Sequence, residues 1–385
     1  MFGQLKSRMS IDRRRGALLS SSALIPLAFG VYGAPSAHAQ AVNLGQSPGN
    51  LIVTSGRTAT QVAVSGHTTT ISTSTMSGGN AYNSFTQFRE AAGNTVNLIV
   101  PGAAKNLVNV VTGGPVNIQG ALNSYKNGSI GGNVIFADSY GFIVGPSGVV
   151  NVGSLSVVTP NKATVDALIS PNGVVNDALA NQMIHGNVPI SPDGSVVISG
   201  QIIAQHGVHI NAHDVLVAGS VPEAERAARQ RAQFESTVNA KGMTEGGAIV
   251  VRNGGISIVA TNDVGVDGAL SATGAKHRGG SVSIAAGDNV TLGASSKIKA
   301  QALAVNATGA ASVAPMITIS AGNKVTVAGA LAAVAAAGGP AGQIQTTGKD
   351  IDVASSANLA AVGVGAGDGG HISIKSTDKI GRAHV

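Results

Sequence analysis

The sequence contains no cysteine and no tryptophan, and only 11% of its 385 residues are charged. Without cysteine no disulfide framework can form, so stability has to come from buried core area. Disordered chains combine low hydrophobicity with high charge, whereas 43% of this chain is hydrophobic. The 53 glycines follow no strict period, which excludes a collagen-like chain. This composition favours stacked β-coils filled with Val, Ile and Ala, with Gly and Asn at the corners.

The N-terminus has the pattern of a cleaved secretory signal peptide. An apolar stretch over 16–31 contains Pro26 and is too short for a membrane span. The basic residues before it are Lys6, Arg8, Arg13, Arg14 and Arg15. The small residues Ala37 and Ala39 predict cleavage before Gln40.

The charge of the chain depends on this segment. Residues 1–39 carry five of the 24 Lys and Arg residues and one of the 18 Asp and Glu residues, which leaves a net charge of +2 on the remainder. No basic patch interleaved with aromatic residues is present, so nucleic-acid binding is not predicted.

The most informative segment is 130–155, where short strands alternate with Gly and Asn. Alternation with period two places three apolar pairs on inward faces, namely Val134 and Phe136, Phe142 and Val144, and Val150 and Val152. Between them we expect corners with positive φ at Gly141, Gly145, Gly148 and Gly153. A chain that turns so often and buries one face each time is predicted to wind into a β-solenoid.

These residues also resemble the haemagglutination-activity motif of two-partner-secretion exoproteins, the large exported filamentous adhesins. That motif reads Asn-Pro-Asn-Gly-Ile, then Phe-Gly, a polar corner and Val-Asn-Val-Gly-Gly-Leu. Its second half is retained at 150–155, with Ser154 in place of the second glycine, while Asp138-Ser139-Tyr140 replaces the Asn-Pro-Asn opening. Upstream, 80–88 and 96–101 resemble a second signature of the family, and 159–163 and 188–200 continue the likeness. The matching motif residues are Asn80, Asn83, Phe85, Phe88, Asp138, Gly141, Phe142, Gly145, Asn151 and Gly153.

The resemblance covers roughly 45–220 and is greatest to the N-terminal domain of leukotoxin-type filamentous haemagglutinins. It implies an all-β fold, a right-handed parallel β-helix with a β-cap and short helices outside the solenoid. It also implies a partner, an outer-membrane transporter whose periplasmic domains recognise the domain while the chain is unfolded. The expected location is outside a Gram-negative cell, secreted or on its surface, and the expected role is adhesion.

Two other functions stay open. The alternative to an adhesin is the stalk of a cytolytic or contact-dependent toxin whose C-terminal effector is missing. A β-helical polysaccharide-active enzyme would need acids clustered on one face. The acids here are scattered at corners, so no enzymatic activity is expected.

The chain divides into segments by pattern. We predict a signal peptide at 1–39, the secretion domain at 40–220, a helical excursion at 221–245 and a β-helical repeat region at 246–379. The repeat region carries copies of one template that begin at Ile256, Val282, Ile317 and Ile372, with a weaker copy at 343–353. Its corner Asn and Asp side chains are expected to hydrogen-bond backbone groups in left-handed turns. Within the secretion domain, 40–79 reads as the cap, and 162–183 has helical spacing and reads as an excursion from the solenoid. Residues 380–385 resemble a translated sequencing adapter, so we expect the chain to be an N-terminal fragment.

The other candidate sites give little support for metal binding or catalysis. His206, His209 and His213 form the only histidine cluster, but on a strand His206 and His209 would face opposite sides, which argues against a metal site. The glycine-rich run 363–370 lacks the tandem repeats of calcium-binding nonapeptides. Ser296 to Lys299 gives an isolated Ser-x-x-Lys, expected by chance. We therefore predict no metal, cofactor or catalytic residue.

Overall fold

A computed structural model describes residues 47–219, 247–274, 278–302, 313–364 and 369–378, all within one compact unit, residues 38–385. The predictions for Ala37, Ala39, Gln40, the helical excursion at 221–245 and residues 380–385 lie outside the described residues.

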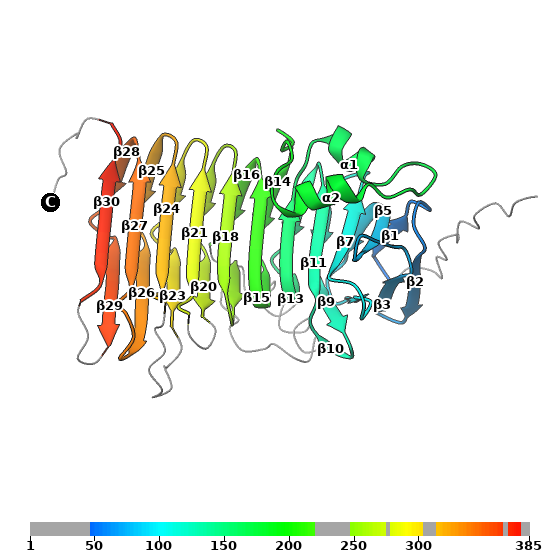
Figure 1. The fold of residues 1–385 in the computed structure, drawn as a ribbon, viewed down its shortest axis with the longest axis horizontal. Helices are drawn as coiled ribbons and strands as arrows, with labels where there is room; N and C mark the ends of the chain where they lie inside the picture. The colour runs from blue at the N-terminus through cyan, green and yellow to red at the C-terminus, as the bar shows by residue number, and fades with distance from the viewer. Residues whose placement is uncertain (1–46, 220–246, 275–277, 303–312, 365–368, 379–385) are drawn as a thin grey trace, which may run out of the picture. The chain divides into compact units, whose positions relative to one another are not determined.

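The described chain winds as a parallel β-helix in which each coil passes through three faces, with successive strands side by side (Figure 1). Face 1 consists of β3 (Thr68–Thr73), β6 (Thr95–Ile99), β9 (Ala121–Lys126), the first halves of β13 (Val149–Val158) and β15 (Gln201–Ala212), β17 (Ala248–Val251), β20 (Ala269–Thr273), β23 (Lys297–Gln301), β26 (Ala330–Ala337) and β29 (Asn358–Val364). Face 2 consists of β5 (Asn80–Glu90), β7 (Asn106–Val111), β11 (Asn133–Asp138), the second halves of β13 and β15, β18 (Gly255–Ala260), β21 (Ser281–Ala286), β24 (Met316–Ala321), β27 (Gln343–Gly348) and β30 (His371–Ser376). Face 3 consists of the end of β5, β8 (Val116–Ile118), β12 (Gly141–Val144), β14 (Ser195–Ile198), β16 (Asp214–Val217), β19 (Val264–Val266), β22 (Val290–Leu292), β25 (Lys324–Val327) and β28 (Asp350–Val353).

The internal repeat seen in the sequence is one coil. Ile256, Val282 and Ile317 pair in register across β18, β21 and β24, and the weaker copy joins them through Ile344 on β27. In each strand the alternate residues point inward and are buried, because side chains alternate across a strand. The in-register stacking buries one continuous core, which runs from Ile52 in the cap to Ile344.

An antiparallel cap covers the first coil. β2 (Thr60–Ser65) and β3 form a hairpin, and β1 (Leu51–Thr54) pairs antiparallel with β5. The short strands β4 (Met76–Ser77) and β10 (Ser129–Ile130) add antiparallel pairs to β5 and β9. Because a cap pairs strand edges that would otherwise be exposed, it closes this end of the solenoid.

Two helices leave the solenoid between β13 and β14, where the sequence shows helical spacing. These are α1 (Lys162–Leu168) and α2 (Asp177–Ile184). Asn161 and Asn176 cap them by accepting hydrogen bonds from the amides of Thr164 and Leu179. The helices pack over face 2, and the residues of this second apolar cluster are Tyr82, Val108, Val110, Ile135, Ala137, Val158, Val165, Leu168, Ile169, Ala180, Met183 and Val188. No helix among the described residues is long and apolar enough to span a membrane.

The predicted fold class is therefore confirmed as an all-β parallel β-helix with a β-cap and short helices outside the solenoid.

Candidate functional site

The two motif segments lie close together in the first coils. β5 carries Asn80 to Phe88 and pairs with β7, and β7 pairs in turn with β11, which ends at Asp138. Of the later motif residues, Gly141 and Phe142 lie on β12, Gly145 follows that strand, and Asn151 and Gly153 lie on β13. On face 2, β7 is thus the strand that separates the two segments.

A stack of phenylalanine rings joins the two segments inside the coil. Phe85 and Phe88 meet edge to face with ring centroids 5.1 Å apart, and Phe88 meets Phe136 in the same way at 5.4 Å. The ring of Phe136 then lies 5.2 Å from that of Phe142. All of these side chains are fully buried. Each aromatic pair contributes about 0.5–1.5 kcal/mol beyond its buried area. The phenylalanine stack therefore ties the cap-proximal coil to the coil of the second motif.

Asparagine ladders run across the same coils. Inside the core, Asn83 accepts a hydrogen bond from Thr60 at 2.9 Å and donates one to Asn109 at 3.0 Å, and Asn109 donates to the Ile135 carbonyl at 3.2 Å. These bonds satisfy polar groups that would be costly to bury alone.

Two further ladders involve motif residues at other positions. On face 2, Asn106 donates to Asn80 at 2.7 Å. On face 1, Asn151 donates to Asn123 at 2.9 Å, and Asn123 donates to Asn97 at 3.1 Å. The Oδ1 atom of Asn151 is buried and has no hydrogen-bond partner. The face 1 ladder therefore ends at Asn151.

Asp138 closes the corner between β11 and β12. Its side chain is buried and accepts hydrogen bonds from the amides of Val116 on the neighbouring coil and Tyr140 in its own turn, both at 2.9 Å. Burial raises the pKa of Asp138 to about 7, although both amides oppose the shift. The carboxyl group thus links two coils at the position where the motif begins.

The motif glycines serve different purposes from those predicted. Gly141 has φ of +121°, as expected for a corner. Gly145, Gly148 and Gly153 do not have positive φ, so that prediction is wrong for them. Gly153 lies within β13, which is a single strand, and a Cβ atom there would be 2.5 Å from the carbonyl oxygen of Gly132. At Gly148 a Cβ atom would be 2.3 Å from the Ile118 carbonyl oxygen. Close approach of the neighbouring coil, not turn geometry, requires glycine at these positions.

In the repeats, Asn and Asp side chains bond the corners to one another, as the sequence predicts. The amide of Asn289 and its side chain both donate to Asp263, at 2.9 and 3.0 Å. The left-handed backbone expected for these corners is not found. Among the described residues, Asn127 is the only non-glycine with positive φ. The side chains therefore connect adjacent coils without a left-handed turn.

Sequence reasoning missed Tyr82 and Glu90. Tyr82 donates a hydrogen bond from its hydroxyl to Asp177 at 3.1 Å, which fastens α2 to β5, and burial raises the pKa of Tyr82 to about 12. Glu90 is buried at the end of β5, and neither carboxylate oxygen has a hydrogen-bond partner. The only signal for Glu90 was a carboxylate at an inward position of the alternation that contains Phe88.

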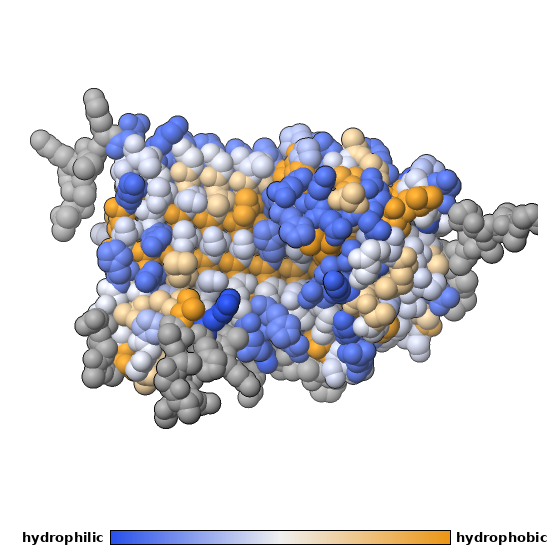
Figure 2. Space-filling view, viewed as in Figure 1, coloured by the Kyte–Doolittle hydropathy of each residue, from blue (hydrophilic) through white to orange (hydrophobic). Residues whose placement is uncertain are grey.

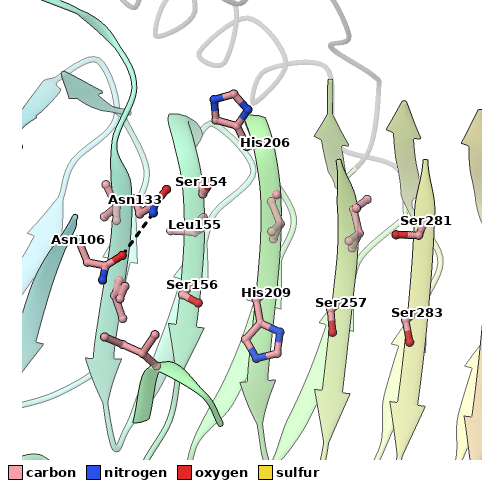
Figure 3. Close-up of a pocket in the computed structure, with 17 residues that line it drawn as sticks. Asn106, Asn133, Ser154, Leu155, Ser156, His206, His209, Ser257, Ser281 and Ser283 are labelled. Atoms are coloured by element: carbon pink, nitrogen blue, oxygen red, sulfur yellow. Dashed lines mark hydrogen bonds between the residues drawn. The ribbon is translucent and has the colours of Figure 1, made fainter. Parts of the chain in front are cut away.

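A groove of about 510 Å³ runs over face 2 beside the helices (Figure 3). It is lined by polar side chains of several coils, by bare backbone at Gly207 and Gly255, and by Ile184 of α2. The polar residues are Asn106, Asn133, Ser154, Ser156, His206, His209, Ser257, Ser281 and Ser283. In Figure 2 this face shows pale, weakly polar rows between orange rows, next to the blue residues of the helical layer. The lining contains no acidic or basic residue other than histidine.

His206 and His209 both line this groove, so the expectation that they face opposite sides is wrong. The register between β13 and β15 shifts here: Val152 pairs with Ala204, but Ser154 pairs with Gly207. The extra residue on β15 interrupts the alternation, as in a β-bulge. Burial lowers the pKa of His209. His213 bonds Thr261 at 2.9 Å instead, and the described residues contain no group of three potential metal ligands among His, Cys, Asp and Glu.

No protein-family model matches the chain, and no curated protein matches it. Among solved structures, the fold is similar to the crystal structure of the HMW1 secretion domain from Haemophilus influenzae. The match covers 85% of this chain and 99% of that one, with 14% sequence identity and a TM-score of 0.32. A likeness at this level does not place the residues of that domain onto those of this chain.

Proposed function

We propose that the first coils are the secretion domain of a two-partner-secretion exoprotein, which an outer-membrane transporter recognises and exports. The observation that supports this most is the convergence of the motif residues. Motif side chains on β5 and β12 belong to one phenylalanine stack, and those on β5 and β13 belong to ladders across the same coils. The motif is therefore a property of one small region next to the cap.

The geometry suits folding after export. Each coil pairs with the coil before it and the coil after it in the chain, so a chain that emerges from its N-terminal side can add coils in sequence. The cap and the phenylalanine stack form the first layers on which later coils build. While the chain is unfolded, the segments that later form these strands have unpaired backbone groups, which could pair as added strands with the periplasmic domains of the transporter.

After export we propose a role as a filamentous adhesin at the cell surface or in the medium. The repeats extend the coil, which suits a stalk or fibre, and a toxin stalk would use the same geometry. A polysaccharide hydrolase needs a pair of carboxylates beside its substrate. The groove on face 2 has no carboxylate in its lining, which favours a non-enzymatic role for that face.

If the chain is exported, the signal peptide is expected to be removed after Ala39. Mass spectrometry of the extracellular protein should then find Gln40 at the N-terminus. Extracellular protein that still begins at Met1 would contradict the cleavage prediction.

The motif itself is tested by Asn151→Leu. The next residue in its column is Ile203, so an aliphatic side chain fits this position and the coil is expected to fold. We expect signal removal to proceed, while most of the protein stays in the periplasm because the transporter no longer recognises the domain. The measurement compares extracellular and periplasmic protein in cells that produce the cognate transporter.

The control is Asn289→Leu, which breaks side-chain hydrogen bonds between adjacent coils at a corner of the repeats. This variant should be exported like the unmodified chain, and neither protein should leave cells that lack the transporter. Equal export of both variants would mean that Asn151 has a structural role only. Export without any transporter would contradict the proposed function.

A further inference from the structure

Glu90 occupies the first position of an aliphatic column in the core. On face 3 each coil places one inward residue directly beneath the previous one, starting at Glu90. The residues that follow it in register are Ile118, Val144, Ile198, Val217, Val266, Leu292, Val327 and Val353. A carboxyl group thus stands where every later coil has a branched aliphatic side chain.

The surroundings of Glu90 offer its charge little compensation. The residue is 2% exposed, and neither carboxylate oxygen has a hydrogen-bond partner. The corner at Gly120 packs tightly against Glu90, because a Cβ atom on Gly120 would be 2.7 Å from Oε1 of Glu90. Burial raises the pKa of Glu90 well above its usual range, and the nearby amide of Val96 opposes this only in part. An ionised carboxylate without a partner is far too costly to bury, so the folded coil holds Glu90 protonated.

Asp138 is a second buried carboxyl group in the same part of the solenoid. It too is 2% exposed, and it is the last residue of β11, at an inward-facing position of that strand. Its two amide partners make ionisation less costly than for Glu90, and its pKa is about 7. Below neutral pH this group is also mainly protonated in the folded coil.

Among the residues that the structure describes, few titratable groups lie near these two carboxyl groups. At the corner of Glu90, His67 bonds Asn94, and Arg89 is the exposed neighbour on β5. At the corner of Asp138, Tyr140 is the adjacent titratable residue and is partly exposed. None of these side chains contributes to the shifts of Glu90 or Asp138. The shifts of the two carboxyl groups therefore arise from their own burial and not from charged neighbours.

We infer that the first coils take up protons at Glu90 and Asp138 as they fold, so that this end of the solenoid is most stable at acidic pH and becomes progressively less stable as the pH rises. In the unfolded chain both groups ionise near pH 4. The folded state binds more protons above that value, so unfolding releases them. Each group raises the unfolding equilibrium constant about tenfold per pH unit until its folded pKa is passed. The inference does not depend on the transporter or on the proposed function.

The test is the pH dependence of unfolding for the purified chain between pH 4 and 9. Glu90→Leu introduces the aliphatic residue type of the rest of the column, and Asp138→Asn removes the second titrating carboxyl group. Relative to the unmodified chain, the slope of log Kunf against pH should fall by about one for Glu90→Leu between pH 5 and 7. Glu90→Leu should also be the more stable protein at pH 8. Asp193→Asn, which changes an exposed turn carboxylate, should leave the slope unchanged.

The number of protons released on unfolding can also be measured directly. Unfolding in weakly buffered solution with a pH indicator should release about one proton fewer for Glu90→Leu than for the unmodified chain at pH 6. For Glu90→Leu at high pH, hydrogen exchange should show increased protection of the amides in β5 to β9 and unchanged protection in β21 to β25. If Glu90→Leu does not fold, Glu90→Gln removes the same titration with a side chain of the same size. Equal slopes and equal proton release in the unmodified chain and the Glu90 variant that folds would overturn the inference.

Discussion

Gly141→Val is expected to prevent the first coils from forming in their native geometry. Gly141 has φ of +121°, a conformation that a β-branched residue does not adopt. A Cβ atom there would also lie 2.2 Å from the carbonyl oxygen of Ser195, which belongs to the neighbouring strand β14. The strained backbone costs about 1–3 kcal/mol. The overlap with a backbone atom adds about 1–3 kcal/mol or more. Together these reach roughly 2–6 kcal/mol, comparable to the total stability of many domains.

The measurement is chemical denaturation followed by circular dichroism, with Gly93→Val as the matched control. Gly93 also has positive φ, at +77°, but a Cβ atom added there would meet no atom within 4 Å beyond its chain neighbours. The control variant should therefore show the strain alone, about 1–3 kcal/mol. Equal destabilisation of the two variants would mean that β14 does not approach Gly141 as closely as described.

Phe136→Ala is expected to lower the free energy of unfolding by about 3–5 kcal/mol. The side chain is fully buried, and its ring contacts those of Phe88 and Phe142. Removing it leaves a cavity between the coils of the two motif segments. Coils that stack through inward side chains cannot collapse around such a cavity without losing the register of neighbouring strands. Most of the loss is therefore expected to remain after relaxation.

Denaturant titration of Phe136→Ala should be compared with Tyr140→Ala, which removes an aromatic ring that is 42% exposed. The control should lose no more than about 0.5 kcal/mol. A double-mutant cycle between Phe88 and Phe136 should give a coupling energy of about 0.5–1.5 kcal/mol. A loss below about 1 kcal/mol for Phe136→Ala would show that its face of β11 points to solvent.

Much of this fold could be predicted from local pattern. Val134, Phe136, Phe142 and Val144 are all buried as the alternation predicts, because the direction of a side chain on a strand depends only on its place in that strand. The helical spacing after Asn161 likewise predicted α1 and α2, since helix periodicity and caps are local properties. The repeat after Gly246 predicted coils of the same register for the same reason.

The contacts between coils could not be obtained in this way. The roles of Gly148 and Gly153 depend on which backbone atoms of the previous coil lie against them. His206 and His209 line the same groove because the register of β15 shifts against β13. Glu90 lacks polar neighbours in its column because the residues stacked after it are aliphatic.

The sequence by itself determined the strands, their inward faces, the helices and the motif residues, because these follow from spacing within a few residues. Only the tertiary structure decided which glycines are corners, which asparagines bond one another and which carboxyl groups lose their solvent. Those outcomes depend on the lateral register of coils more than twenty residues apart, as for Asn83 and Asn109, and on the insertions between coils. No local period encodes that register, which is set when the stacked coils bury a common core.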